Sequence, residues 1–177
     1  MSAELAELRR LVGELRDREA IRDVITGIAR GVDRFDGALL GSCIHPDASL
    51  DMGGAAPVTG EAFIAMLKPP AQAPLGRMHV VSNQRIVLKG DEAWSESHVL
   101  SCQAIAATEQ IHTRIRAGRY LDRFTRRDGV WRLAARTFVD EWGRVDALSE
   151  ASPRGAHNGA PAPEDALYRL FGEEASR

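Results

Sequence analysis

Residues 79–106 read HVVSNQRIVLKGDEAWSESHVLSCQAIA and decide the fold. Two runs of alternating apolar and polar residues, at 79–88 and 93–106, flank the turn Lys89-Gly90-Asp91. Successive side chains of a strand point to opposite faces of a sheet, and a glycine between two such runs permits a tight turn. This stretch therefore predicts a β-hairpin.

Two more strand-like segments follow, at 112–126 and 130–142, with Arg127-Asp128-Gly129 as the turn between them. The second half of the chain thus predicts four successive strands that pair antiparallel. Strands of this length exceed the usual five or six residues and must bend or bulge to remain within one domain. We therefore expect a strongly curved sheet.

The segment before the hairpin is predicted to be helical. Residues 3–30 carry apolar side chains three and four positions apart, which indicates one long amphipathic helix or two short ones. A second helix is predicted at 38–44, a short strand at 48–53, and a third helix that opens at Thr59. Helices followed by a strand meander predict an α+β fold, in which helices packed on one face of the curved sheet form a cone around a pocket.

Composition and length indicate one globular domain over residues 1–148. Hydrophobic residues make up 44% of the 177 residues and charged residues 27%, the usual balance of a chain that buries a core. The region 149–177 is interpreted as a linker and a short docking helix, or as a partly ordered terminus. Leu167, Leu170 and Phe171 would pack over the pocket mouth or onto a neighbouring subunit.

Charge and hydropathy argue against several classes of partner. The net charge of −2 provides no basic field for nucleic acid or for an acidic membrane surface. The chain contains no run of 18 apolar residues and no signal-like N-terminus, so we expect a cytoplasmic protein. Cys43 and Cys102 lack the spacing of a zinc or redox motif and are interpreted as reduced core thiols. No spacing of His, Asp and Glu predicts a metal site, and no glycine-rich turn predicts a nucleotide, so no cofactor is expected.

Six fragments between residues 15 and 142 occur in an order typical of one known family. They are Arg18-Glu19-Ala20-Ile21-Arg22-Asp23, Gly31-Val32-Asp33, His45-Pro46-Asp47-Ala48, His79-Val80-Val81-Ser82-Asn83, Gly118-Arg119-Tyr120-Leu121-Asp122 and Arg127-Asp128-Gly129-Val130-Trp131-Arg132-Leu133. Together they resemble the SnoaL-like branch of the nuclear-transport-factor-2-like superfamily, whose fold is a cystatin-like cone. That superfamily includes scytalone dehydratase, the lindane dehydrochlorinase and bile-acid dehydratase. It also includes accessory subunits without catalytic residues, so fold alone does not settle activity.

The resemblance implies a candidate active site. In the dehydratase and dehydrochlorinase branch, an aspartate at the end of the first long helix pairs with a histidine that opens the first long strand, and Asp33 and His79 occupy those places. An arginine on the last strand completes the pattern in some members, and Arg136 fits that place best. One departure is Ile28, which stands where those lyases carry a lysine or a tyrosine.

These residue types suit proton transfer. Histidine has an unperturbed pKa of about 6.5, and a carboxylate on one ring nitrogen leaves the other nitrogen free to act as a base. Arg136 would stabilise an enolate or a leaving oxyanion. Simple alternation places Arg136 opposite the core residues Trp131 and Leu133, so it faces the pocket only if the strand bulges and is otherwise a surface arginine. His79 satisfied by a backbone carbonyl and a solvent-exposed Asp33 are the structural alternatives.

Ile28 and three further residues are candidates for substrate binding. Alternation places His98 on the face of Trp94, Leu100 and Cys102, where it would line the cavity. Asn83 shares the predicted face of His79. Tyr120 would donate a hydrogen bond to a substrate oxygen, although aromatic core packing is its common alternative.

The leading hypothesis is a cofactor-independent lyase or isomerase, dehydratase-like, acting on a hydrophobic polycyclic, aromatic or polyketide-like molecule. The alternative is a non-catalytic small-molecule-binding or accessory subunit, such as the small subunit of ring-hydroxylating dioxygenases. The resemblance also implies a homodimer or homotrimer that associates through the convex side of the sheet.

Overall fold

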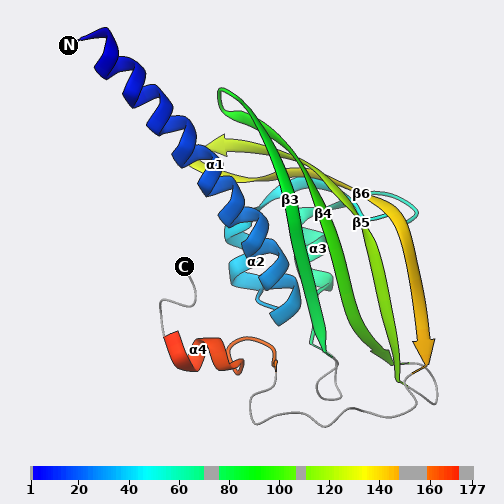
Figure 1. The fold of residues 1–177 in the computed structure, drawn as a ribbon. Helices are drawn as coiled ribbons and strands as arrows, with labels where there is room; N and C mark the ends of the chain where they lie inside the picture. Colours follow the sequence, from blue (N-terminus) through cyan, green and yellow to red (C-terminus); the bar gives the residue numbers. More distant parts are fainter. Residues whose placement is uncertain (1, 70–75, 107–110, 148–158, 172–177) are drawn as a thin grey trace.

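Six strands form one curled sheet in the order β2-β1-β6-β5-β4-β3. The computed structural model describes residues 2–69, 76–106, 111–147 and 159–171 (Figure 1). The strands are β1 (Ile44–Asp51), β2 (Val58–Thr59), β3 (Arg77–Lys89), β4 (Glu92–Ala106), β5 (Ile111–Arg127) and β6 (Val130–Ala147). The helices are α1 (Ala3–Arg34), α2 (Gly37–Cys43), α3 (Gly60–Met66) and α4 (Ala166–Phe171). The α+β cone predicted from the sequence is confirmed.

The meander from β3 to β6 pairs antiparallel throughout, as the two turn motifs predict. The edge beyond β6 differs from the expected antiparallel sheet, because β1 pairs parallel with β6 and antiparallel with β2. β1 also begins at Ile44 rather than at residue 48. The register between β1 and β6 shifts between Ile44 and Ser49, and Pro46 lies within this irregular stretch, where a missing N–H does not interrupt a regular ladder.

The N-terminal segment is one continuous helix. The Ser2 side chain accepts from the backbone N–H of Leu5 at the start of α1, and Phe35 ends the helix in the left-handed conformation with its N–H bonded to the Gly31 carbonyl. These two caps satisfy orphan groups of the helix ends. Figure 1 shows α1 running beside β3, while its first turns project beyond the sheet. Among the described residues, no helix is long and apolar enough to cross a membrane.

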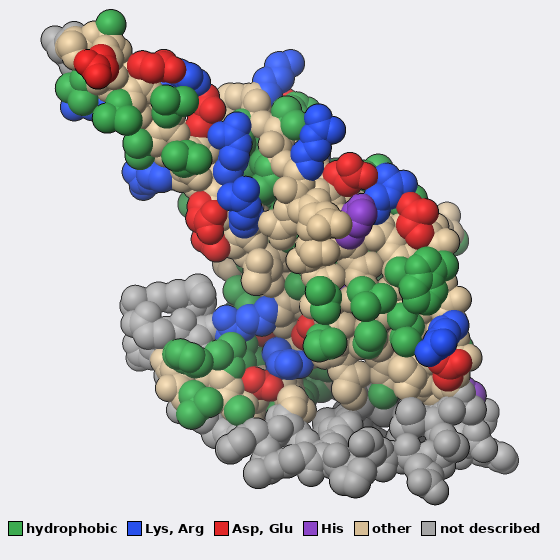
Figure 2. Space-filling model, viewed as in Figure 1, with side chains coloured by type: hydrophobic (Ala, Val, Ile, Leu, Met, Phe, Trp, Pro, Cys, Tyr) green, Lys and Arg blue, Asp and Glu red, His purple; other side chains and the backbone are tan. Residues whose placement is uncertain are grey.

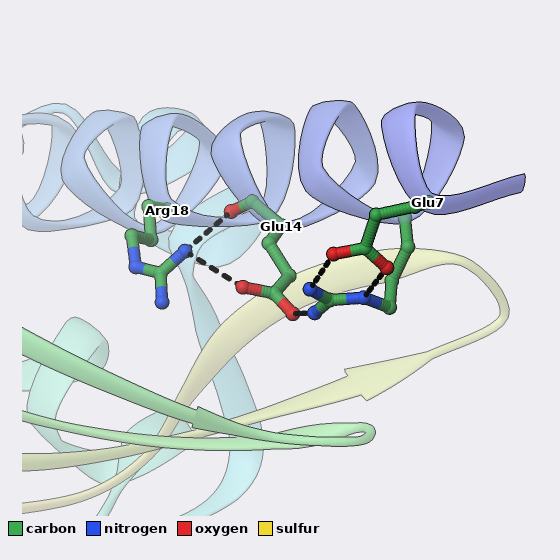
Figure 3. A network of polar contacts seen from close by, with 4 residues as sticks. Glu7, Glu14 and Arg18 are labelled. Atoms are coloured by element: carbon green, nitrogen blue, oxygen red, sulfur yellow. Dashed lines mark hydrogen bonds and ion pairs between the residues drawn. The ribbon is translucent and has the colours of Figure 1, made fainter. Parts of the chain in front are cut away.

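The projecting part of α1 is supported by ion pairs one turn apart. Arg10 bonds Glu7 at 2.7 Å and also pairs with Glu14, and Arg18 donates to Glu14 at 3.3 Å (Figure 3). Exposed pairs at this spacing each contribute about 0.3 to 0.5 kcal/mol to helix stability. This arm therefore stays helical without packing on the sheet.

The hydrophobic core lies between the second half of α1, α2 and the end of the sheet that carries the β3–β4 and β5–β6 turns. Ile21, Ile25 and Leu40 are at most 1% exposed and belong to one cluster with Phe124 and Leu133. Burying each such side chain stabilises the fold by about 1.5 to 3 kcal/mol. The core anchors the end of α1 against the sheet and so fixes where Asp33 lies.

The C-terminal helix docks on the end of α1 by polar contacts. Arg34 forms an ion pair with Asp165 at 3.1 Å, and the Tyr168 hydroxyl donates to Asp36, the N-cap of α2. Leu170 and Phe171 are 78% and 60% exposed, so they do not pack over the pocket mouth of their own chain. Their packing onto a neighbouring subunit stays a prediction. Most of the predicted linker, residues 149–158, lies outside the described residues.

Candidate active site

Asp33 and His79 meet where the end of α1 faces the start of β3. The ring Nδ1 of His79 lies 2.6 Å from Oδ1 of Asp33, and the backbone N–H of His79 donates to Oδ2 at 2.9 Å. Their side chains are only 9% and 10% exposed. The geometry expected of a dyad is therefore present, and neither structural alternative describes these two residues.

The contact of Nδ1 with Asp33 sets the tautomer that a neutral imidazole has in this position. A carboxylate oxygen accepts hydrogen bonds, so Nδ1 carries a hydrogen, and in the neutral ring Nε2 then carries the lone pair. A carboxylate near a helix C-terminus is unfavourable because the helix dipole is negative there. The two bonds from His79 compensate for this position. The arrangement presents Nε2 as a base with an oriented ring.

The sheet register extends this site across the inner face. Residues opposite each other on neighbouring strands share a face, so the row that starts at His79 continues through Ser101 and Arg116. A row further towards the core joins Ser97, Tyr120 and Phe138. The hydroxyl oxygen of Ser97 is buried and has no hydrogen-bond partner among the described residues.

Arg136 reaches this inner face because β6 bulges. Phe124 pairs with Leu133 while Arg123 pairs with Ala135, so β6 holds one extra residue at this point and the alternation reverses. Arg136 is 6% exposed, donates from Nε and Nη2 to the two carboxylate oxygens of Asp122 at 2.8 Å each, and lies over the Tyr120 ring.

Tyr120 lies on the inner face with the Arg136 guanidinium over its ring, 3.8 Å from the ring centroid. Its side chain is buried, and burial raises the pKa of its phenol; Arg136 opposes this effect, and Asp122 and Asp33 add to it. A neutral phenol is a hydrogen-bond donor.

Comparisons with known proteins identify the family and the fold of this domain. The model of the SnoaL-like domain matches residues 13–137. The chain belongs to the SnoaL-like family. Its fold is similar to that of a type 2 hexachlorocyclohexane dehydrochlorinase (LinA), with a TM-score of 0.69 and 22% identity over 81% of this chain and 98% of that chain.

Two other solved structures have the same fold. A scytalone dehydratase-like protein from Novosphingobium aromaticivorans gives a TM-score of 0.66 at 20% identity, over 82% of this chain and 97% of that one. A protein from Kribbella flavida gives 0.66 at 17% identity, over 74% and 95%. No curated protein matches the sequence. At these identities the three structures show that this SnoaL-like domain shares their fold.

Two predicted substrate-binding residues lie outside the inner face of the SnoaL-like domain. His98 pairs with Ser82 and is exposed on the outer face, where it lines a hollow of about 490 Å³. Its shared face with Trp94 and Leu100 was predicted correctly, but that face is the convex one. Asn83 lies in a bulge with a φ of 50° and contacts His98 at 3.1 Å. The bulge adds one residue to β3 between Ser82 and Arg85, which turns Asn83 away from His79.

Ile28, also predicted to bind substrate, instead belongs to the core of the SnoaL-like domain. It is 2% exposed and lies in the cluster that contains Ile25 and Leu40. The position that carries a polar side chain in the resembling lyases is therefore used for packing in this chain. Any additional polar group near the dyad has to come from the strands.

The sequence reasoning missed Asp122, Arg77 and Arg114. Asp122 stands two residues after Tyr120, so alternation alone would have placed both on the same face, although its partner Arg136 reaches that face only through the bulge in β6. No local pattern brings Arg77 and Arg114 together, because their proximity depends on the register of three strands. Among the described residues, no group of three His, Cys, Asp or Glu side chains is arranged to hold a metal ion.

Proposed function

We propose that this SnoaL-like domain is a cofactor-independent lyase or isomerase in which His79 acts as a general base. The observation that carries the proposal is the 2.6 Å contact between His79 Nδ1 and Asp33 on the inner face of the sheet. A histidine oriented in this way takes a proton through Nε2, and the carboxylate stabilises the imidazolium that forms.

The proposed reaction needs no external reagent, because the proton that His79 removes is returned in a later step. Nε2 of His79 removes a proton from a carbon next to an electron-withdrawing group, and the C–H electron pair forms a carbon–carbon double bond. In a dehydration, the neighbouring C–O bond breaks, and the departing hydroxide takes the proton back from His79 and leaves as water. In an isomerisation, the proton returns to another carbon. General base catalysis of this kind accelerates such steps by about 10²- to 10⁴-fold.

Tyr120 is the group best placed to stabilise developing negative charge on the substrate. Its phenol lies on the inner face within electrostatic range of Asp33, and the Arg136 guanidinium stacks on its ring with 3.8 Å to the centroid. Arg136 itself is bonded through two nitrogens to Asp122. We therefore assign Tyr120 as the donor and Arg136 as the residue that positions it.

A panel of ring-bearing β-hydroxy ketones and cyclic enones tests the proposal. Formation of a conjugated product, followed by ultraviolet absorbance, and solvent deuterium incorporation, followed by mass spectrometry, would report elimination and proton exchange. We expect activity with at least one compound and a loss of about 10²-fold or more in His79→Ala. Turnover that is unchanged in His79→Ala would contradict the proposal.

The second candidate is a ligand-binding or accessory subunit with the same fold. Ile28 favours it, because this core position lacks the polar group found in the resembling lyases. In that case the panel would show binding by calorimetry without deuterium incorporation, and His79→Ala would alter affinity alone.

A further inference from the structure

Arginines gather on the inner face at the end of the sheet where β3 begins and β4 ends. The row that joins Arg77, Gln103 and Arg114 lies directly beside the row of His79, Ser101 and Arg116. Strands in a sheet are about 4.8 Å apart, so the Cα atoms of Arg77 and Arg114 are separated by only about 10 Å. Side chains as long as arginine span that gap.

Two of these arginines have no acidic partner within the described part of the chain. Arg114 donates from Nη2 to the Gln103 amide oxygen at 2.9 Å, while its Nε is buried without a hydrogen-bond partner. Arg77 makes a weak 3.4 Å contact with the Val32 carbonyl and lies 4.8 Å from the centroid of the Phe35 ring. Arg116, by contrast, is paired with Asp140 at 2.6 Å.

Most other arginines of the sheet are neutralised, which makes this pair distinct. Each of the following forms an ion pair with a carboxylate: Arg116, Arg119, Arg123, Arg126, Arg127, Arg136 and Arg144. Leaving two half-buried guanidinium groups close together without a counter-charge is unfavourable.

The two guanidinium groups influence each other and the dyad. Burial lowers the pKa of Arg77, Arg114 lowers it further, and Asp33 opposes both effects. Arg77 is therefore near enough to Asp33 to feel its charge and near enough to Arg114 to be repelled. The unmatched positive charge lies at the edge of the candidate active site, on the same face as His79.

We propose that Arg77 and Arg114 form a subsite that binds a carboxylate group of the substrate beside the His79 dyad. This inference rests on the proposed function and specifies the substrate class as a hydrophobic ring compound that carries a carboxylate. The planar fork of a guanidinium matches the two oxygens of a carboxylate, and the buried Nε of Arg114 supplies a donor that needs an acceptor. The carboxylate anchors the molecule while the ring lies towards Val81, Val99 and Tyr120.

Matched acid and amide probes test the subsite without any need for turnover. Isothermal titration calorimetry would compare 2-naphthoate with 2-naphthamide, and benzoate with benzamide. We expect each acid to bind at least about tenfold more tightly than its amide, and its affinity alone to fall as sodium chloride is raised. Equal affinity of acid and amide, or no detectable binding of either acid, would overturn the proposal.

Substitutions of Arg77 and Arg114 test whether these two residues bind the acid. Arg77→Met and Arg114→Met should each weaken binding of the acid by about tenfold and leave the amide within about twofold. Arg77→Lys should lose less, because it keeps the charge but not the fork. The control is Arg127→Met, since Arg127 is an ion-paired residue at the far turn and should change neither affinity. Unchanged acid binding in both Met variants, with melting temperatures near wild type, would rule out the subsite.

The result of the subsite test can be distinguished from the result of the test for the proposed reaction. If acids bind through Arg77 and Arg114 in His79→Ala as well as in the wild type, the subsite stands even where no turnover is found. If a neutral compound is turned over and carboxylates have no advantage, the reaction stands and the subsite is wrong.

Discussion

The carboxylate of Asp33 holds both the ring and the backbone of His79, through contacts of 2.6 Å to Nδ1 and 2.9 Å to the backbone nitrogen. The second bond holds the carboxylate at the start of β3. The orientation of the imidazole therefore depends on two residues that are 46 positions apart in sequence and lie on different elements. A base fixed in this way does not need to reorganise when it accepts a proton.

Replacing either member of the dyad should remove most of the activity. Asp33→Asn keeps the shape but presents a donor or a weaker acceptor to Nδ1, which disturbs the tautomer, and we expect kcat to fall by about 10²- to 10⁴-fold. The double variant Asp33→Asn with His79→Ala should be little worse than the worse single variant, because members of one unit are not additive. Steady-state kinetics on a substrate from the panel would measure this. Multiplicative losses would show that the two residues act independently.

Removing the hydroxyl of Tyr120 should affect catalysis more than stability. No described residue hydrogen-bonds that hydroxyl, so Tyr120→Phe keeps the packing against Phe138 and Arg136. We expect kcat to fall by about 10²-fold if the phenol stabilises the developing charge. Urea unfolding should show a change within about 0.5 kcal/mol, the range of a substitution that leaves packing intact. A large loss of stability with kcat unchanged would assign Tyr120 to the core instead.

The sequence predicts the pairing of Asp33 with His79, whereas it does not predict where Asn83, His98 and Arg136 lie. Asp33 and His79 stand at the end of a helix and the start of a strand, and both boundaries are marked by periodicity and by turn residues. The positions of Asn83 and Arg136 depend on single-residue bulges in β3 and β6, which leave no signature in an alternating pattern. The same is true of the outer placement of His98, since alternation groups residues by face without saying which face is concave.

Pairing of distant segments accounts for the other differences. The parallel contact of β1 with β6 joins Leu50 to Arg136 across about half of the chain, and no local motif predicts it. Arg77 and Arg114 approach each other only because Gln103 on β4 pairs with both. Local patterns predict the elements, and the register among them decides which side chains meet.

Removing one partner of the ion pair between Asp122 and Arg136, while the other stays buried, should strongly destabilise the fold. Their side chains are 0% and 6% exposed, so removing one carboxylate leaves a buried charge without compensation. Asp122→Ala should cost about 3 to 5 kcal/mol, whereas Asp122→Leu combined with Arg136→Met should recover much of that loss. Urea denaturation of the three proteins is the measurement. A single variant as stable as wild type would show that water already reaches the pair.

His45 should make the domain less stable in mild acid. Its ring bonds the carbonyl and the hydroxyl of Thr125 at 3.2 and 3.0 Å. Burial lowers the pKa of His45; the Thr125 carbonyl and Asp47 oppose this effect, and Arg127 and Arg132 add to it. The lowered pKa means that the unfolded chain binds a proton more readily than the folded one. Stability is therefore present above the unfolded value of about 6.5 and is lost as the pH falls below it.

Thermal unfolding on both sides of that value tests the role of His45. The melting temperature of the wild type should fall as the pH is lowered through about 6.5. His45→Gln keeps a donor for Thr125 but does not titrate, so its decrease should be smaller. An equal decrease in both proteins would assign the acid sensitivity to other groups.

The convex face of the sheet carries an apolar surface suited to a second copy of the chain. Figure 2 shows hydrophobic side chains gathered on the face turned to the viewer. The exposed apolar residues of the outer face include Met78, Val80, Val87, Trp94, Leu100, Leu121 and Trp142. They border hollows of about 390 and 490 Å³. Tryptophan is enriched in protein interfaces, and monomeric proteins rarely expose large contiguous apolar patches.

We therefore propose that the protein forms a homodimer or homotrimer through this face, and one charged substitution should dissociate it. Leu100 lies opposite Val80 in the sheet and next to the hollow lined by Trp142, so a carboxylate there would be buried without a partner in the interface. Light scattering at micromolar concentration should report an oligomer for the wild type and a monomer for Leu100→Asp. The matched control Val130→Asp changes an equally apolar exposed residue at the β5–β6 turn and should leave the oligomer intact. Because the dyad lies on the opposite face, the Leu100→Asp monomer should still bind the ligands of the inner site. A wild type that is monomeric at micromolar concentration would contradict the proposed oligomer.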